Sequence, residues 1–354
     1  MKICFFNTTK TWGGGENWHL NTAQAFRARG HEVVIVATKN GVLSQRASDK
    51  GLTVRHFAIH NLSFLNPFKR YTIYKYFVKE TFDTVIFNSS NELKVAVSAA
   101  VSAKISRVIY RRGSAIPTKN SFLNRLIFKK LTDIIANSEA TKKSILQNNY
   151  NLFPADKIVV IYNGIDVSAF EQKEAPKNDV PVVGNLGRCV YQKGQDLLLH
   201  VVHKLKQRGV ACRFKVGGDG PLLADLKMQA AHLGIADMVE FTGFVDDSKK
   251  FLQSVDIFVL SSRGEGFGYV LAEAMASAKP VVVFDVSSSP EVVANEQTGI
   301  LVPFANVDLF ADAIEKLVNN PTLRETFGKK GMDVVTEKFS IEQNENKLID
   351  FLTK

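Results

Sequence analysis

Residues 257–276 read IFVLSSRGEGFGYVLAEAMA and contain one complete strand, loop and helix. The apolar run 257–260 predicts a buried strand, and the apolar and small residues of 269–276 predict a helix. The glycines between them allow the backbone to turn tightly and to approach a ligand closely. A strand that leads into a helix in this way is the building unit of a parallel sheet.

Short apolar runs alternate with amphipathic stretches over the rest of the chain as well. The predicted strands span residues 2–7, 32–37, 54–57, 84–88, 107–110, 133–136 and 158–161 in a first series, and 181–186, 213–217, 239–242, 257–260, 280–284 and 299–302 in a second. Two such series indicate an α/β protein with two doubly wound, Rossmann-like domains whose parallel sheets face a central cleft. The loops that follow the strands should carry the chemistry.

The boundary between the domains is predicted between the two series of strands. Residues 167–179 are polar and contain Pro176, which is typical of a linker. We therefore expect an N-terminal domain over 1–166, the linker over 167–179 and a C-terminal domain over 180–337. Residues 338–354 should hold a final helix, because Ser340 and Gln343 have the spacing of a capping box.

Composition excludes several classes of protein. The 354 residues are 45% hydrophobic and 23% charged, as in an ordinary folded protein of about two domains. No apolar run is long enough for a membrane span, and the first strand turns polar too early for a signal peptide, so we expect a cytoplasmic protein. Cys4, Cys189 and Cys212 lie far apart, which predicts buried, reduced thiols.

Positive charge is concentrated in the first half of the chain. Residues 1–166 contain 24 Lys and Arg against 10 Asp and Glu, a net charge of +14, and the remainder contains 21 against 25, a net charge of −4. The first domain is therefore expected to meet something anionic, such as nucleic acid, an anionic membrane or a phosphorylated acceptor. A basic, solvated surface without such a partner is the alternative.

The first candidate loop is formed by Gly13, Gly14, Gly15 and Glu16, which follow the first strand and open a helix. Glycines at a helix N-terminus can present backbone amides to an anion. The pattern is neither the dinucleotide fingerprint nor a P-loop, and it is also compatible with an ordinary tight turn.

Two cations define the second candidate loop. Arg188 follows the strand 181–186, and Lys193 lies five positions later at the start of the next helix. A planar guanidinium and a compact ammonium around one loop suit a diphosphate that gains negative charge as a bond breaks, although an isolated pair of this kind is often only a solvated surface.

Two carboxylates frame the third loop, which contains Gly264, Gly266 and Gly268. Glu265 precedes the predicted helix 269–276, and Glu273 lies within it. Because carboxylates repel phosphate, they would serve best as acceptors for sugar or ribose hydroxyls, which points to a nucleotide-sugar. The alternative is a glutamate at a helix N-terminus together with an unrelated surface glutamate.

Taken together, these loops resemble a known family. The matching motifs are GGGE at 13–16, NSEAT at 137–141, NGID at 163–166, GR at 187–188 with KG at 193–194, GDGP at 218–221, GF at 243–244, EGFG at 265–268 and EAMA at 273–276. In this order they resemble the retaining family-4 glycosyltransferases of the GT-B fold, over nearly the whole chain. More loosely, the sequence is similar to bacterial transferases that build lipopolysaccharide core or other surface glycans.

The resemblance implies roles for individual residues. It places Arg188 and Lys193 on the donor diphosphate and Glu265 on the donor sugar, and these three form the expected catalytic set. The other donor-binding residues that it implies are Gly14, Gly15, Gly187, Gly218, Phe244, Gly266, Phe267, Gly268, Tyr269 and Glu273. In this family the final helix crosses back onto the first domain.

The acceptor side departs from the family pattern. Many relatives carry a histidine in a loop where this chain has Arg111 and Arg112. The resemblance therefore assigns no side-chain base, and in a retaining front-face mechanism the leaving phosphate itself can accept the proton of the acceptor. Those two arginines, with Glu16, are the expected acceptor-side residues, and an acceptor phosphate is one ligand they could bind. The chain has no Asp-x-Asp motif and no ligand-spaced histidines, so we expect no metal and no cofactor beyond the nucleotide-sugar.

Two further functions remain open at this stage. A GT-B epimerase acting on sugar nucleotides would use a similar fold, and a noncatalytic protein that binds a membrane or an anionic polymer would explain the charge but not the loops of the second half. We expect no nucleic-acid partner. Residues 66–79 and 121–130 mix aromatic or aliphatic residues with Lys and Arg and could contact an anionic inner membrane, although a buried aromatic face is the favoured interpretation for 66–79.

Overall fold

The computed structural model describes residues 1–147, 149, 151–170 and 178–353, which form two compact units. Unit 1 comprises Met1–Asn163 with the C-terminal residues from Asn344, and unit 2 comprises Gly164–Gln343. Of the expected linker 167–179, residues 171–177 lie outside the described residues, and η3 (Val167–Phe170) is a short 3-10 helix.

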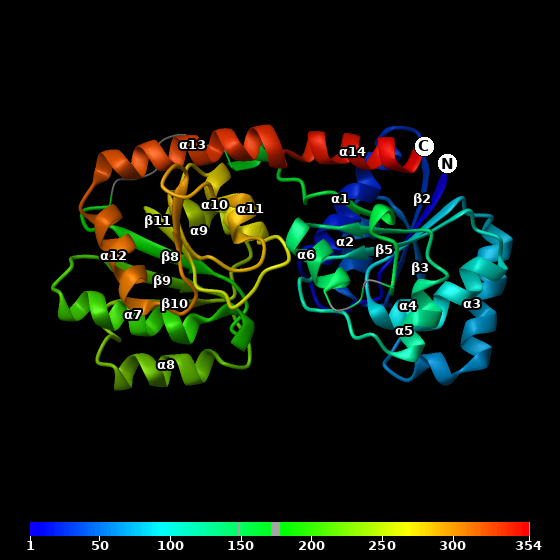
Figure 1. The fold of residues 1–354 in the computed structure, drawn as a ribbon, viewed down its shortest axis with the longest axis horizontal. Coiled ribbons are helices and arrows are strands. Elements are labelled where there is room, and N and C mark those ends of the chain that lie inside the picture. Colours follow the sequence, from blue (N-terminus) through cyan, green and yellow to red (C-terminus); the bar gives the residue numbers. More distant parts are fainter. Residues whose placement is uncertain (148, 150, 171–177, 354) are drawn as a thin grey trace. The chain divides into compact units, whose positions relative to one another are not determined.

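Unit 1 is built around a parallel sheet of seven strands in the order β3-β2-β1-β4-β5-β6-β7. Figure 1 labels three of these strands, β2, β3 and β5, and the helices α1 to α6 around them. The strands are β1 (Lys2–Phe6), β2 (Glu32–Ala37), β3 (Thr53–His56), β4 (Thr84–Phe87), β5 (Arg107–Arg112), β6 (Asp133–Ala136) and β7 (Ile158–Val160). The helices are α1 (Gly14–Ala28), α2 (Val42–Asp49), α3 (Pro67–Glu80), α4 (Ser90–Ser102), α5 (Phe122–Phe128), α6 (Glu139–Leu146) and, from Asn344 on, α14 (Ile341–Thr353), with the short helices η1 (Ser63–Leu65) and η2 (Ala155–Lys157).

Successive side chains of each strand point to opposite faces of the sheet, so the core of unit 1 has two parts, one on each face. Ile3 and Phe5 of β1 pack with residues of α1, α2 and α14, whereas Cys4 and Phe6 pack with residues of α3 to α6. Both faces are therefore covered by helices, as a buried parallel sheet requires.

Unit 2 repeats the plan with six parallel strands in the order β10-β9-β8-β11-β12-β13. The strands are β8 (Val182–Leu186), β9 (Arg213–Gly217), β10 (Val239–Gly243), β11 (Ile257–Leu260), β12 (Val281–Phe284) and β13 (Gly299–Val302). The helices are α7 (Gln195–Gln207), α8 (Leu223–His232), α9 (Ser248–Gln253), α10 (Tyr269–Ala276), α11 (Ser289–Val292), α12 (Val307–Val318) and α13 (Pro321–Phe339), with the short helix η4 (Tyr191–Lys193).

The structure confirms the α/β class and the two parallel sheets. Each expected strand is present, and β2, β6, β9, β11 and β13 have the expected bounds. α6 begins after Ser138, whose hydroxyl accepts a hydrogen bond from the Thr141 amide and so caps the helix. All three cysteines are buried thiols, also as expected.

The favoured interpretation of residues 66–79 was wrong for two of its five aromatic residues. α3 buries Phe77, but Phe68 is 81% exposed and Tyr71 is also exposed. The helix packs on the core through a narrow stripe that includes Ile73, and no neighbouring element among the described residues buries Phe68 or Tyr71.

Among the described residues, no helix combines the length and apolar character needed to cross a membrane.

Candidate active site

The best-defined site of unit 2 lies between β8 and β11, where the order of the strands reverses and the chain continues on the other side of the sheet. β8 pairs with β11, although β9 and β10 intervene in sequence, and the loops 187–194 and 261–268 leave the carboxyl ends of these two strands. Ligands of doubly wound sheets bind at such a switch point. Gln192 joins the loops, because its Nε2 donates to Gly264 O at 2.8 Å and its carbonyl accepts from the Arg263 amide at 2.8 Å.

A glycine allows this close approach. Gly194 has a φ of +64°, and a Cβ atom built there would lie 2.0 Å from the carbonyl oxygen of Ser261. No other residue type fits that backbone contact without moving one of the loops.

An ion pair lies at the centre of the two loops. Lys193 Nζ is 2.6 Å from Glu265 Oε1, and the hydroxyl of Ser262 donates to the same carboxylate oxygen at 2.6 Å. Glu265 is only 8% exposed. The sequence singled out both Lys193 and Glu265 for different parts of a donor, and the structure brings them into direct contact.

A second ion pair supports the same loops and was missed in the sequence. Arg263 donates to both carboxylate oxygens of Asp196, at 2.8 and 2.6 Å, and its guanidinium lies 3.9 Å from the ring centroid of Tyr191. The guanidinium hydrogen bond lowers the pKa of Asp196. Residues this far apart in the chain give no local signal, except that Arg263 lies in the loop after β11 and Asp196 in the first turn of the helix that follows β8.

Arg188, in the loop after β8, is an exposed cation. Within the described residues, its guanidinium has no carboxylate partner. Gly187 lies against the aliphatic part of Lys193, since a Cβ atom built there would make an ordinary contact with its Cδ at 3.4 Å. Gly218, with a φ of +132°, lies close to the Gly187 carbonyl, because a Cβ atom built at Gly218 would lie 2.0 Å from the carbonyl oxygen of Gly187. The loops after β8 and β9 therefore meet through backbone.

The glycine-rich loop after β11 leads directly into the N-terminus of α10. Gly268 caps α10 with a φ of +82°, while the Phe267 side chain is 2% exposed and packs 5.4 Å from the ring of Phe339. Gly266 and Tyr269, on either side, are partly exposed. Phe244, after β10, differs from Phe267 in that its ring is 73% exposed.

Glu273 lies one turn into α10. Burial raises its pKa to about 7, and a hydrogen bond with Ser248 and the charge of Lys249 act in the opposite direction. Glu273 is thus a carboxyl group whose protonation changes near neutral pH.

Unit 1 has a polar cluster at its own switch point, between β1 and β4. Glu16 is buried, and its Oε1 accepts from Asn7 Nδ2 at 3.1 Å and from Asn88 Nδ2 at 3.3 Å. Gly15 packs on the side-chain amide of Asn88, because a Cβ atom built at Gly15 would lie 2.8 Å from Asn88 Nδ2. The amides were missed in the sequence. Their signal was that Asn7 and Asn88 each directly follow a strand.

The two acceptor-side arginines point to opposite faces of the sheet of unit 1. Arg111 is buried, donates to Asn163 Oδ1 at 2.8 Å and lies 5.1 Å from the ring of Trp18. Arg112 donates to the Tyr110 hydroxyl at 3.3 Å and to the Ile116 carbonyl. Arg111 joins the cluster of Glu16 through Asn88, whose Oδ1 accepts from its Nη1 at 3.5 Å, whereas Arg112 does not. The acceptor-side roles of Glu16, Arg111 and Arg112 stay predictions.

His19 also lies beside this cluster. Its Nδ1 is 2.9 Å from Gly15 O, and burial, with the nearby Arg111, lowers its pKa to about 3. It is therefore a neutral histidine that helps to hold the start of α1.

The described residues contain no group of three or more His, Cys, Asp or Glu that could hold a metal ion. Independence from metal ions stays a prediction.

Two family models match the chain and meet near residue 166. The model described as Glycosyltransferase Family 4 matches residues 12–169, and the model described as Glycosyl transferases group 1 matches residues 166–334. Together they cover all the loops described above.

Curated proteins and solved structures give consistent similarities. The lipopolysaccharide core biosynthesis glycosyltransferase LpsE of Rhizobium meliloti is 27% identical over 351 residues, which are 97% of this chain and 96% of that protein. The alpha-D-kanosaminyltransferase of Streptomyces kanamyceticus is 33% identical over 168 residues, but the match spans only 46% of this chain and 43% of that protein. The structure of Anabaena HepE in complex with UDP-glucose has a similar fold, with a TM-score of 0.87 at 21% identity over 100% of this chain and 99% of that one.

Proposed function

The chain belongs to the glycosyltransferases of the GT-B fold, with a family 4 domain followed by a group 1 domain, and on this premise we propose that it transfers a sugar, with retention of anomeric configuration, from a nucleoside diphosphate sugar to a cell-surface glycan or glycolipid. The observation that carries the proposal is the Lys193–Glu265 ion pair at the switch point of unit 2, with an exposed Arg188 in the same loop as Lys193. These groups combine cations for a diphosphate with a carboxylate for sugar hydroxyls.

The donor would be held mainly by unit 2. Arg188 and Lys193 bind the diphosphate, the backbone of 266–269 at the start of α10 adds amide donors, and Glu265 accepts hydrogen bonds from the sugar. Glu273 accepts from the ribose. The remaining residues of the proposed donor site are Gly14, Gly15, Gly187, Gly218 and Phe244, the last as an exposed ring on which a base can stack.

The chemical step follows from where charge develops. The bond from the anomeric carbon to the diphosphate breaks, and a bond to the acceptor oxygen forms on the same face of the sugar. The acceptor's proton passes to the leaving phosphate oxygen. Arg188 and Lys193 stabilise the leaving group more as its charge grows, so they lower the barrier and do not merely tighten binding. We propose that no metal ion takes part.

Relatives narrow the donors to be tried first. HepE was crystallised with UDP-glucose, and a relative of Mycobacterium tuberculosis that is 28% identical over 294 residues is named as dependent on GDP-mannose. UDP-sugars and GDP-sugars are therefore the first candidates. LpsE supports a lipopolysaccharide-core acceptor in the same way.

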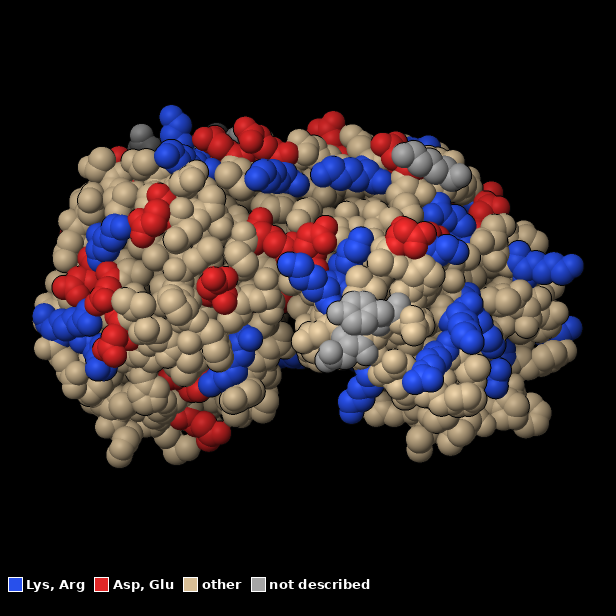
Figure 2. Space-filling view, in the orientation of Figure 1, with Lys and Arg blue, Asp and Glu red and all other residues tan. Residues whose placement is uncertain are grey.

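A membrane-bound acceptor would suit the surface of unit 1. We define the docking face as the exposed apolar residues of η1, α3 and α5 with the basic residues between them, namely Leu65, Phe68, Tyr71, Phe122, Leu126, Arg70, Lys75, Arg125, Lys129 and Lys130. Phe122 is 76% exposed. In Figure 2, blue atoms gather over unit 1, whereas red and blue alternate over unit 2. Exposed aromatic residues beside Lys and Arg suit the interface of an anionic membrane.

The proposed function is tested by binding first and turnover second. A thermal-shift screen of the purified protein against UDP-, GDP-, ADP- and CMP-sugars should give a rise in Tm with one nucleotide series, and the rise should disappear in Lys193→Ala. Transfer to an extracted glycolipid, with the anomeric configuration read by NMR, then tests retention. No binding in any series would refute the donor site, and an epimerised or hydrolysed donor without transfer would support the epimerase instead.

A further inference from the structure

A pocket of about 200 Å³ opens at the carboxyl edge of the sheet of unit 1, between α4, α5 and the loop after β5. Ser90, the first residue of α4, and Lys94, one turn later, form one side of it, and Arg112, the last residue of β5, forms another. The edge is the one at which ligands of doubly wound sheets bind. Arg112 thus belongs to a different site from Arg111.

The lining of this pocket is cationic. Lys94, Arg112 and Lys119 all line it, and none of its described lining residues is Asp or Glu. In the part of the chain that the structure describes, neither lysine forms an ion pair. Three positive charges around a small volume without a carboxylate create a positive potential that favours an anion.

Two buried polar atoms of the lining lack a partner. Thr118 is 9% exposed and its Oγ1 makes no hydrogen bond, and Nε of Arg112 is also buried without a partner. Buried polar atoms are nearly always hydrogen-bonded, and an unsatisfied one is costly. Nε of arginine can only donate, so the missing partner has to offer an acceptor atom.

The rest of the pocket wall is apolar. Leu93, Tyr110, Ile127 and Phe128 are buried residues of the core that reach the pocket surface. Ile116, in the loop beside it, is 63% exposed. Several acceptor oxygens for the cations and for Nε, next to an apolar surface, describe a phosphate group attached to a hydrocarbon or other apolar body.

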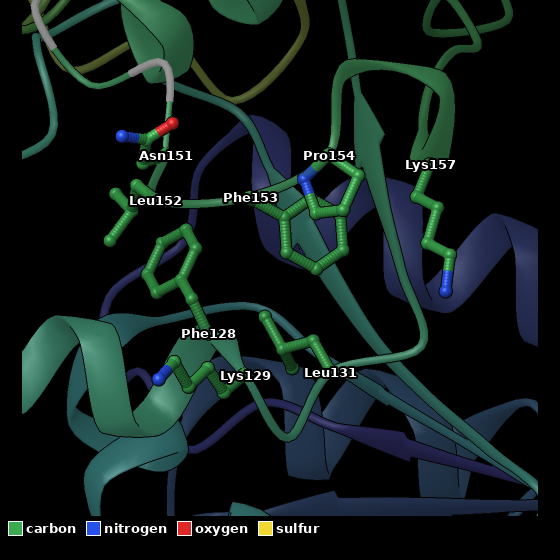
Figure 3. A pocket seen from close by; sticks show the side chains of 8 residues that line it. All are labelled: Phe128, Lys129, Leu131, Asn151, Leu152, Phe153, Pro154 and Lys157. Atoms are coloured by element: carbon green, nitrogen blue, oxygen red, sulfur yellow. The ribbon is translucent and has the colours of Figure 1, made fainter.

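A neighbouring pocket lacks these features. It lies on the other side of Phe128 and has a volume of about 470 Å³ (Figure 3). Its two lysines, Lys129 and Lys157, lie on opposite sides of the apolar side chains, and none of its described lining residues has a buried, unpartnered polar atom. It therefore supports no ligand of its own.

We propose that the pocket of Lys94, Arg112, Thr118 and Lys119 binds a phosphate group of the acceptor. The inference rests on the proposed transferase function, and it adds that the acceptor is phosphorylated and amphiphilic. The same chemistry is present in phospholipid headgroups, so the test has to separate the acceptor from the membrane.

Calorimetric titration of the full chain with octyl phosphate, and with octanol as the uncharged match, tests the pocket itself. Octyl phosphate should bind, octanol should bind at least about tenfold more weakly, and Lys94→Gln with Lys119→Gln should weaken octyl phosphate by about tenfold or more. Thr118→Val, which removes only the hydroxyl, should weaken it by a smaller factor. The matched control is Lys104→Gln with Lys143→Gln, which removes the same charge outside the pocket and should leave the affinity within about twofold. Equal losses in both double variants, or no preference over octanol, would overturn the pocket.

Vesicle binding separates the two sources of phosphate. Co-sedimentation with phosphatidylcholine vesicles that contain a minority of phosphatidylglycerol should fall equally in the two double variants if the pocket serves the acceptor. A larger fall in the Lys94→Gln and Lys119→Gln variant would assign the pocket to phospholipid and overturn the acceptor role. UDP- and GDP-sugar thermal shifts on the same variants separate this inference from the proposed function. Nucleotide-sugar binding without octyl phosphate binding would refute the pocket alone, and the reverse would refute the donor site alone.

Discussion

Lys193 and Glu265 are 72 positions apart in the chain, yet Nζ of one lies 2.6 Å from Oε1 of the other. The cation proposed for the diphosphate is thus held by the carboxylate proposed for the sugar. In the unliganded protein each group neutralises the other in a nearly buried place, and both are already oriented when a donor arrives. Such preorganisation reduces the cost of ordering side chains on binding.

Removing the cation of this pair should reduce both stability and donor binding. Lys193→Ala leaves the carboxylate of Glu265 without its ammonium partner, so we expect a loss of about 1–3 kcal/mol in the free energy of unfolding. The control is Lys204→Ala, which breaks the pair with Asp308 at 43% and 64% side-chain exposure and should cost about 0–1 kcal/mol. Denaturant titration measures both. Lys193→Met with Glu265→Gln should recover stability without recovering nucleotide binding, and recovery of both would show that the pair has only a structural role.

Arg188 should matter for turnover and not for folding. It is exposed and has no carboxylate partner among the described residues, so Arg188→Ala should change the free energy of unfolding by no more than about 0.5 kcal/mol. Loss of a group that stabilises the leaving diphosphate should lower kcat/KM by about 10²-fold. Arg213→Ala, at the amino end of β9, removes an exposed arginine far from the loops and serves as the control for steady-state kinetics. Equal activity of the two variants would contradict the role of Arg188.

The backbone contact at Gly194 should tolerate no side chain. Gly194 and Gly209 both have positive φ, +64° and +69°, but a Cβ at Gly209 has no neighbour within 4 Å. Gly209→Ala should therefore cost only the left-handed conformation, about 1–2 kcal/mol. Gly194→Ala adds a clash with Ser261 and should cost at least about 2 kcal/mol more, with loss of nucleotide binding. Similar unfolding midpoints for the two variants would show that the loops separate easily.

Glu273 should make stability depend on pH in a defined direction. Its pKa in the folded protein is about 7, above the ordinary value of 4.5, because burial disfavours the charged form. The folded protein then binds more protons than the unfolded chain between these values, so the contribution of Glu273 is complete below about pH 4.5 and is lost as the pH rises through about 7. The difference in stability between wild type and Glu273→Gln should decline over that window. Glu92, whose pKa burial also raises to about 7, titrates in both proteins and cancels. A flat difference would mean that Glu273 ionises normally.

The strands could be predicted because each is an apolar run between loops, as at Glu32–Ala37, where the predicted and observed bounds agree. β5 was predicted two residues too short. Its last two residues are arginines, and charged residues do not normally indicate a buried strand. The sequence does not show that Arg111 has the partners Asn163 and Trp18, which allow it to be buried there. The exposure of Phe68 was not predictable from spacing, because an aromatic residue at helical spacing is buried only where a neighbouring element covers that face.

The sequence also indicated some features of the candidate site and missed others. Glycines and charged residues after strands indicated which loops matter, because the carboxyl ends of parallel strands share one edge. The Lys193–Glu265 contact depends on the distance between the loops 187–194 and 261–268 in the folded protein, and the sequence of neither loop predicts that distance. The Arg263–Asp196 pair and the Asn88–Glu16 contact were missed for the same reason.

Arg111 and Arg112 are consecutive residues at the end of β5, and their side chains lie on opposite faces of the sheet. For protein engineering, the charge of the pocket on one face can therefore be changed without changing the Arg111 contacts on the other. Replacing Arg112 together with Lys94 and Lys119 would change the charge of the pocket while Arg111, bonded to Asn163, stays in place on the other face. A library restricted to those three positions could therefore search for new acceptors in a scaffold whose sugar-transfer machinery is left intact.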